Sequence, residues 1–217
     1  MRPADLSVLL RAVDGADSER ALTIRDRIAL RRAEPADLFA AVTLIGTFFS
    51  VAAGSVDGTL FFTATFGALL AVGRLQLPTG FELAVTAGIV LQGWGNALLL
   101  FEYVGWYDKA VHFLTPLLMI PALYLLLARV GAVAPLGPNQ LRRGALGVFI
   151  ITLALGVALA ATWELVEGSA DRWLGMSLAH GYLETIDDLY CSLMGSVGAA
   201  AMLAWLASAP GRTPLSE

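Results

Sequence analysis

The sequence predicts an all-α polytopic membrane protein, a bundle of about six transmembrane helices. Of its 217 residues, 57% are hydrophobic and only 15% are charged, and the mean hydropathy is +0.71. Soluble domains carry about 25% charged residues, so this chain is too apolar for a disordered or nucleic-acid-binding protein. The single cysteine, Cys191, excludes an internal disulfide framework. From Asp37 onward, apolar runs long enough to cross a bilayer follow one another.

Residues 1–36 are predicted to form a cytoplasmic, basic, amphipathic segment. Seven arginines fall before residue 35, interspersed with acids, and no apolar leader with a cleavage site is visible. Asp17 and Ser18 precede an apolar periodic stretch that ends at Pro35, which indicates a capped helix. Such a helix would either lie on anionic lipid or stay solvated and only set the orientation of the chain.

We expect six spans of ~20 residues each, of which the second is short. They are predicted at residues 38–56, 59–72, 83–104, 110–130, 145–166 and 186–207, with turn residues between them. Together they form a transmembrane domain over residues 37–208, followed by a short cytoplasmic tail at 209–217. Small residues at helical spacing, as around Gly156 and Gly195, favour close helix packing, with a dimerisation motif as the alternative.

The basic residues predict the orientation. If the N-terminus lies inside, six spans place twelve of the fourteen basic residues on the inner side and leave only Lys109 and Arg172 outside. Basic residues concentrate on the cytoplasmic side of membrane proteins, so we expect an N-in/C-in topology. A re-entrant second span would move every later loop to the other side of the membrane, and the basic residues would then no longer be concentrated on the inner side.

Three outer helix ends each carry a pair of acidic or metal-ligating side chains. Spacings of three or four residues put the members of a pair on one helix face. The pairs are Asp108 and His112, Glu164 and Glu167, and Glu184 and Asp188, with Asp187 beside the last. His112, Glu164 and Asp188 lie about one turn, ~5 Å, deeper than their partners, so the three pairs can face a common point.

Carboxylates that converge in a poorly hydrated place repel one another, so they either take up protons or bind a cation. One histidine with several carboxylates suits a divalent metal ion, Mg²⁺, Mn²⁺, Fe²⁺ or Zn²⁺. The predicted metal ligands are Asp108, His112, Glu164 and Asp188, and the predicted catalytic or outer-shell residues are Glu167, Glu184 and Asp187. The alternative is that these acids are simply solvated, because acids collect outside wherever basic residues are held inside.

Two other polar features accompany the acids. Gln92 and Asn96 lie four residues apart in the third span, either as hydrogen-bonding contacts between helices or as the polar wall of a substrate cavity. A long outer loop is expected at residues 168–183, with Trp173 and His180 in it. This loop would either fold over the site as a lid or anchor in the membrane interface.

Three short motifs carry a family resemblance. They are YDKAVHF from Tyr107, WELVE from Trp163 and ETIDDL from Glu184, with Gly195 following. Together they resemble the YjdF-like family of bacterial inner-membrane proteins, whose pattern is D-K-x-x-H-F, then E-x-x-E, then D-[TA]-x-x-D-[LM]. Glu184 stands where that family has Asp. The resemblance covers about residues 85–200 and implies a multi-pass protein of the bacterial cytoplasmic (inner) membrane, but it supplies no reaction.

Three functions remain open on the sequence alone. The first is a metal-dependent enzyme that acts on a lipid or lipid-linked substrate. The second is a cation or proton transporter, which normally has ionisable groups near the membrane midplane, where this chain has only Gln92 and Asn96. The third is a non-catalytic scaffold or sensor. Membrane lipids are the expected partners, and no nucleic acid is expected. No nucleophile motif or phosphate-binding glycine loop indicates a reaction type.

Overall fold

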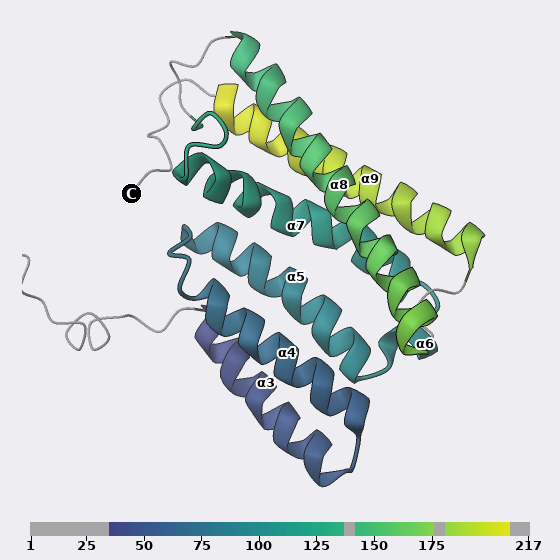
Figure 1. Ribbon diagram of the computed structural model, residues 1–217. Helices are drawn as coiled ribbons and strands as arrows, with labels where there is room; N and C mark the ends of the chain where they lie inside the picture. Colours follow the sequence, from purple (N-terminus) through teal and green to yellow (C-terminus); the bar gives the residue numbers. More distant parts are fainter. Residues whose placement is uncertain (1–34, 137–141, 176–180, 209–217) are drawn as a thin grey trace, which may run out of the picture. The chain divides into compact units, whose positions relative to one another are not determined.

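The computed structural model describes residues 35–136, 142–175 and 181–208, all of which belong to one unit (Figure 1). Every regular element within these ranges is an α-helix, which confirms the all-α prediction. The amphipathic helix predicted before Pro35, the predicted tail at 209–217 and His180 of the predicted outer loop lie outside the described residues.

The six predicted spans correspond, in order, to six long helices. These are α3 (Pro35–Ala52), α4 (Val56–Val72), α5 (Thr79–Ala97), α7 (Tyr107–Arg129), α8 (Arg142–Leu174) and α9 (Tyr182–Ser208), with the one-turn helix α6 (Leu100–Tyr103) between α5 and α7. By length and composition, α3, α7, α8 and α9 can cross a membrane. The helix α4, with 17 residues, is apolar but shorter, and α5 is not among the four.

The third predicted span, 83–104, is too long, because α5 ends at Ala97. The chain turns at Leu99, whose φ of 59° is left-handed, and then forms α6. The side chain of Tyr107 packs on this end of α5, where a Cβ at Gly95 would collide with it. Its hydroxyl donates to the Leu91 carbonyl oxygen at 2.6 Å. A tertiary contact therefore ends this helix within a continuous apolar run.

The fifth predicted span, 145–166, is too short, because α8 continues to Leu174. The expected loop at 168–183 is therefore helical over its first part, and Glu167 and Asp171 lie on the helix. Gly168 does not stop it, since a single glycine costs a helix only about 1 kcal/mol. Trp173 lies on the last turn and is exposed.

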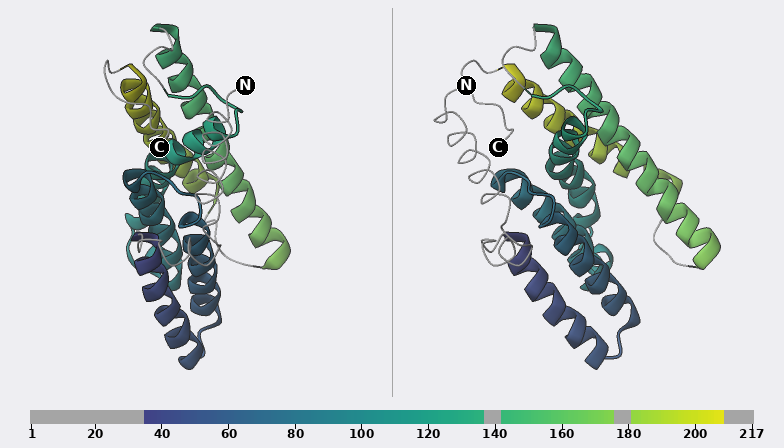
Figure 2. Two further views of the ribbon diagram at one scale, coloured as in Figure 1. Left: turned by 90° about the vertical axis from the view of Figure 1, so that its left-hand side faces the viewer. Right: turned by 60° about the vertical axis from the view of Figure 1, so that its left-hand side comes forward.

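The helices form two groups of three that meet along α5 and α7, as Figures 1 and 2 show. In one group α3, α4 and α5 contact one another, and in the other α9 packs against both α7 and α8. Among the described helices, α8 contacts only α7 and α9. We call the end where α7 and α9 begin and α8 finishes the site end. Apolar clusters around Val72 and Ala122, and around Tyr124 and Leu203, fill the opposite end.

Small residues bring α9 close to both of its neighbours. A Cβ at Gly195 would collide with the Phe113 carbonyl oxygen of α7, and a Cβ at Gly156 of α8 would collide with the Ser196 side chain. Both glycines are thus needed for the close approach that the sequence predicts. Asp188 lies two turns before Gly195 on α9, so the α7–α9 contact fixes its height opposite the first turns of α7.

Candidate metal centre

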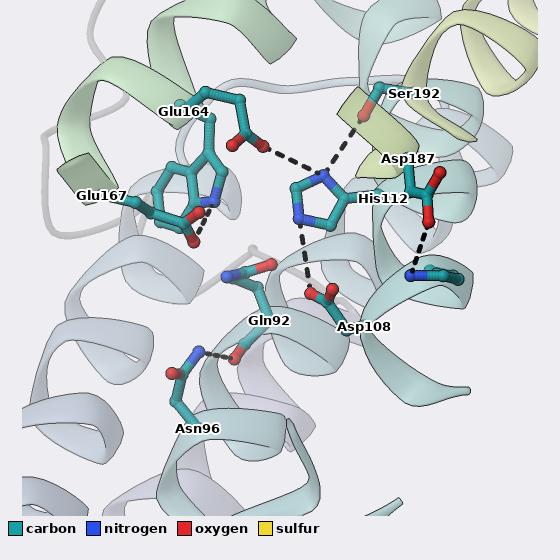
Figure 3. Close-up of polar contacts among 10 residues, drawn as sticks. Gln92, Asn96, Asp108, His112, Glu164, Glu167, Asp187 and Ser192 are labelled. Carbon is teal, nitrogen blue, oxygen red and sulfur yellow. Dashed lines mark hydrogen bonds and ion pairs between the residues drawn. The ribbon is translucent and has the colours of Figure 1, made fainter. Parts of the chain in front are cut away.

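His112 lies at the middle of a cluster of acids at the site end of the bundle, and only 8% of this residue is exposed. Figure 3 shows its ring with Asp108 at one edge and with Glu164 and Ser192 at the other. These side chains come from the first turns of α7, the last third of α8 and the first turns of α9. The three helix ends that the sequence predicts to converge are therefore close together.

The Nε2 edge of the ring faces one acid of its own helix. His112 Nε2 lies 3.4 Å from Asp108 Oδ1, a pair four residues apart on α7. Ligand atoms of Asp108, His112 and Asp188 all lie within 4.8 Å of one another. Asp188 is only 3% exposed, and its Oδ1 atom has no hydrogen-bond partner among the described residues. A buried carboxylate oxygen without a donor is costly, because nothing replaces its lost hydration.

The Nδ1 edge faces α8 and α9. Ser192 Oγ lies 3.3 Å from His112 Nδ1, and Glu164 Oε1 lies 3.8 Å from it. The Glu164 side chain is 9% exposed, and its Oε1 atom also lacks a hydrogen-bond partner within the described part of the chain. Ligand atoms of His112, Glu164 and Glu167 form a second group within 4.8 Å.

The four predicted metal ligands thus fall into two overlapping groups that share His112. Asp108 and Asp188 belong to one group, and Glu164 belongs to the other together with Glu167. A neutral imidazole has one nitrogen with a free lone pair and one N–H. The ring can therefore give one nitrogen to a cation while the other nitrogen donates to an acceptor on the opposite side.

The remaining predicted residues, Glu167, Asp187 and Glu184, lie in different surroundings. Glu167 Oε1 accepts a hydrogen bond of 2.7 Å from the Trp163 indole nitrogen, one turn earlier on α8. The Asp187 side chain is 60% exposed and pairs with Lys109 Nζ at 3.7 Å, away from both groups. Glu184 is half-buried one turn before Asp188 and lies in neither group.

Next to the cluster lies a cavity of about 500 Å³, bounded by α4, α5, α7, α8 and α9. His112 and Ser192 form part of its wall at the site end. Gln92 and Asn96 also line it, which agrees with the second of their two predicted roles, a polar cavity wall, rather than with contacts between helices. The Asn96 amide donates to the Gln92 carbonyl oxygen at 2.9 Å (Figure 3). Most of the other lining residues are apolar.

Three residues that contact the predicted site, Ser192, Trp163 and Lys109, were not predicted to belong to it. Helical spacing could have found two of them. Ser192 lies four residues after Asp188, and Trp163 lies four residues before Glu167, so each shares a helix face with a predicted site residue. The pairing of Lys109 with Asp187 joins α7 to α9 and has no signal in spacing along one helix.

Fold and site together define an all-helical membrane protein with a carboxylate–histidine cluster beside an apolar cavity. Residues 36–209 match a family described as predicted membrane protein, DUF2238, and the chain belongs to this family. The match agrees with the resemblance to YjdF-like membrane proteins, and the family description names no activity. No curated protein and no solved structure matches the chain.

Proposed function

We propose that the protein is a metal-dependent membrane enzyme that acts on a lipid or lipid-linked substrate. The observation that carries this proposal is the buried, unpartnered Asp188 Oδ1 beside Asp108 and His112. A divalent cation would supply the missing partner and would neutralise the repulsion between the two aspartates. Two carboxylates and one imidazole suit Mg²⁺, Mn²⁺, Fe²⁺ or Zn²⁺ and leave coordination positions open for water or substrate.

In this proposal the metal would bind His112 Nε2, while Ser192 Oγ, 3.3 Å from Nδ1, would accept the Nδ1–H hydrogen bond. The Glu164 carboxylate, 3.8 Å from Nδ1, would help to hold the ring by its charge. The bound metal would polarise a substrate oxygen or activate water. Among the three predicted catalytic residues we favour Glu167 as the base, because Trp163, which holds its carboxylate, also lines the cavity. Glu184 and Asp187 would act further out.

The proposed topology has six spans with both termini in the cytoplasm of a bacterial cell. It divides the chain into a cytoplasmic segment (1–36), a membrane domain (37–208) and a cytoplasmic tail (209–217). The site end then faces the outer leaflet of the cytoplasmic membrane. Lys109 and Arg172, which this topology leaves outside, lie at the site end on α7 and α8. Arg74 and Arg129, which it places inside, lie at the opposite end. This separation supports the proposed topology.

The cluster would also suit a cation or proton transporter. Against this, His112 is the only ionisable side chain among the described residues that line the cavity. Its deeper wall carries no charged group for a proton or cation to use, as a path across the membrane would need. A scaffold or sensor with solvated acids is harder to reconcile with the burial of His112 and Asp188.

The proposal is tested by the metal content of purified protein, measured by elemental analysis. Asp188→Asn should remove most of the bound metal, because it takes away a charged ligand at the buried edge of the ring. The neighbouring variant Asp187→Asn is the matched control, since its exposed carboxylate lies outside the cluster. Negligible metal in the unmodified protein, or equal metal in both variants, would overturn the proposed centre. If metal binds, a screen of lipid substrates against an ion-flux assay in vesicles separates enzyme from transporter.

A further inference from the structure

The wall of the cavity includes two helices that do not pack on each other, α4 and α8. Both helices line it, α4 through residues such as Ala64 and α8 through residues such as Ala160. Yet α4 and α8 share no contact along their backbones, because α8 touches only α7 and α9. Within the described residues, the backbones of α4 and α8 therefore do not pack together over this side of the cavity.

The chemistry of the wall changes from one end of the cavity to the other. At the site end it carries the His112 ring and the amides of Gln92 and Asn96. Two turns deeper it is formed by Met119, Gly88 and small side chains. On α7 the distance from residue 112 to residue 119 corresponds to about 10 Å at 1.5 Å per residue. The wall is apolar over nearly all of its surface, with its few polar groups toward the site end, which suits the hydrocarbon chain of a lipid whose polar head lies near His112.

We infer that this cavity holds one hydrocarbon chain of a membrane lipid, which enters sideways between α4 and α8. The inference rests on the proposed function and deepens it, because it identifies the substrate as a lipid that is bound by a single chain. The volume of about 500 Å³ lies within the usual range for one small ligand. The polar end of the lipid lies against Gln92 and the His112 ring, and its chain reaches Met119.

Alanine side chains provide the space. Ala64 and Ala160 line the cavity from α4 and α8, and a leucine at either position would occupy volume that the chain needs. A chain that is excluded from the cavity returns to the hydrocarbon of the bilayer, so a leucine lowers occupancy by filling the volume itself.

The test is photolabelling in phosphatidylcholine vesicles that contain a lipid with a diazirine at the end of one chain. Mass spectrometry then locates the labelled residues. We expect labelling of Met119, which lies at the deep end of the cavity, in addition to Phe49, which is exposed on the lipid-facing side of α3. Ala160→Leu should remove most of the Met119 labelling, because its side chain fills the cavity, and should leave Phe49 labelling unchanged.

Ala158→Leu is the matched control, because Ala158 is exposed on the same helix and does not line the cavity. It should leave both labels unchanged. Absence of Met119 labelling in the unmodified protein, or equal labelling in the two leucine variants, would overturn the chain site. Met119 labelling that falls as protein concentration rises would assign the cavity to a second copy of the chain and would also overturn it.

The same labelling, repeated with Asp188→Asn and after treatment with a chelator, separates the two proposals. If the unmodified protein binds no metal and Met119 is still labelled, the chain site is supported and the metal-dependent enzyme is refuted. If the protein binds metal and Met119 is not labelled, the metal centre is supported and the chain site is refuted.

Discussion

At the scale of single residues, the His112 ring connects the two groups of acids, because it belongs to both of them. Its Nδ1 atom lies within hydrogen-bonding distance of Ser192 Oγ, at 3.3 Å, and faces the Glu164 carboxylate, whose Oε1 atom is 3.8 Å away. A hydroxyl that accepts from Nδ1–H fixes the tautomer in which Nε2 keeps its lone pair. In the proposed metal centre the ring would adopt this tautomer, so that the Nε2 lone pair would face Asp108 and Asp188.

We expect Ser192→Ala and Glu164→Gln to weaken metal binding about 10- to 100-fold without abolishing it, as is usual for groups that orient a ligand. Competition with a metal-binding dye measures this. Glu102→Gln, at an exposed acid on α6, should leave the affinity unchanged. If instead Glu164→Gln removed the metal and Asp188→Asn spared it, the metal would be bound at Nδ1, together with Glu167.

At the scale of helices, residue spacing predicted which side chains share a face, and the structure agrees for Asp108 and His112. It could not predict where α5 ends, because Tyr107 from the next long helix causes that turn. Nor could spacing divide the acids between the two edges of one ring. That division depends on how α8 and α9 are set against α7, and Gly156 and Gly195 control this through close approaches between helices.

Gly195→Ala should therefore disturb the site from two turns away. The added Cβ meets the Phe113 carbonyl oxygen, which is backbone and cannot rotate aside, so α9 must move from α7. Overpacking of this kind costs about 1–3 kcal/mol. We expect a lower unfolding temperature in detergent together with reduced metal content.

Gly147→Ala on α8 is the control for this variant, because no atom lies within 4 Å of the position of the added Cβ. Alanine is favoured over glycine in a helix by up to about 1 kcal/mol, so this variant should be as stable as the unmodified protein or slightly more stable. Equal destabilisation by both variants would show that the α7–α9 contact has no special role.

At the scale of the whole molecule, composition and apolar run length were enough to predict a helical membrane protein, because every backbone group must find its partner within a helix in lipid. The same uniform apolarity hides which helices are neighbours. Outward and inward faces of membrane helices are both apolar, so neither the division into two groups along α5 and α7 nor the cavity between α4 and α8 could be read from hydrophobic periodicity.

The proposed orientation predicts that a reporter inserted after Gly175, between α8 and α9, lies outside the cell. Alkaline phosphatase activity at this position should be high, and the same reporter placed after Arg74, between α4 and α5, should be inactive. The reason is the concentration of arginines on the cytoplasmic side. High activity at Arg74 together with none at Gly175 would contradict the N-in/C-in topology and would place the acids in the cytoplasm.

The junction between the two helix groups also affects how the sequence can change over evolution. Outward positions such as Phe49 of α3 and Ile150 of α8 are largely exposed and need only remain apolar. The helix α7 contacts α5 on one side and α8 and α9 on the other, and Val111, Ile120 and Tyr124 are fully enclosed there. Among relatives we expect α3 and α8 to vary freely on their outward faces, while α7 accepts a new side chain only when α5 or α9 changes with it.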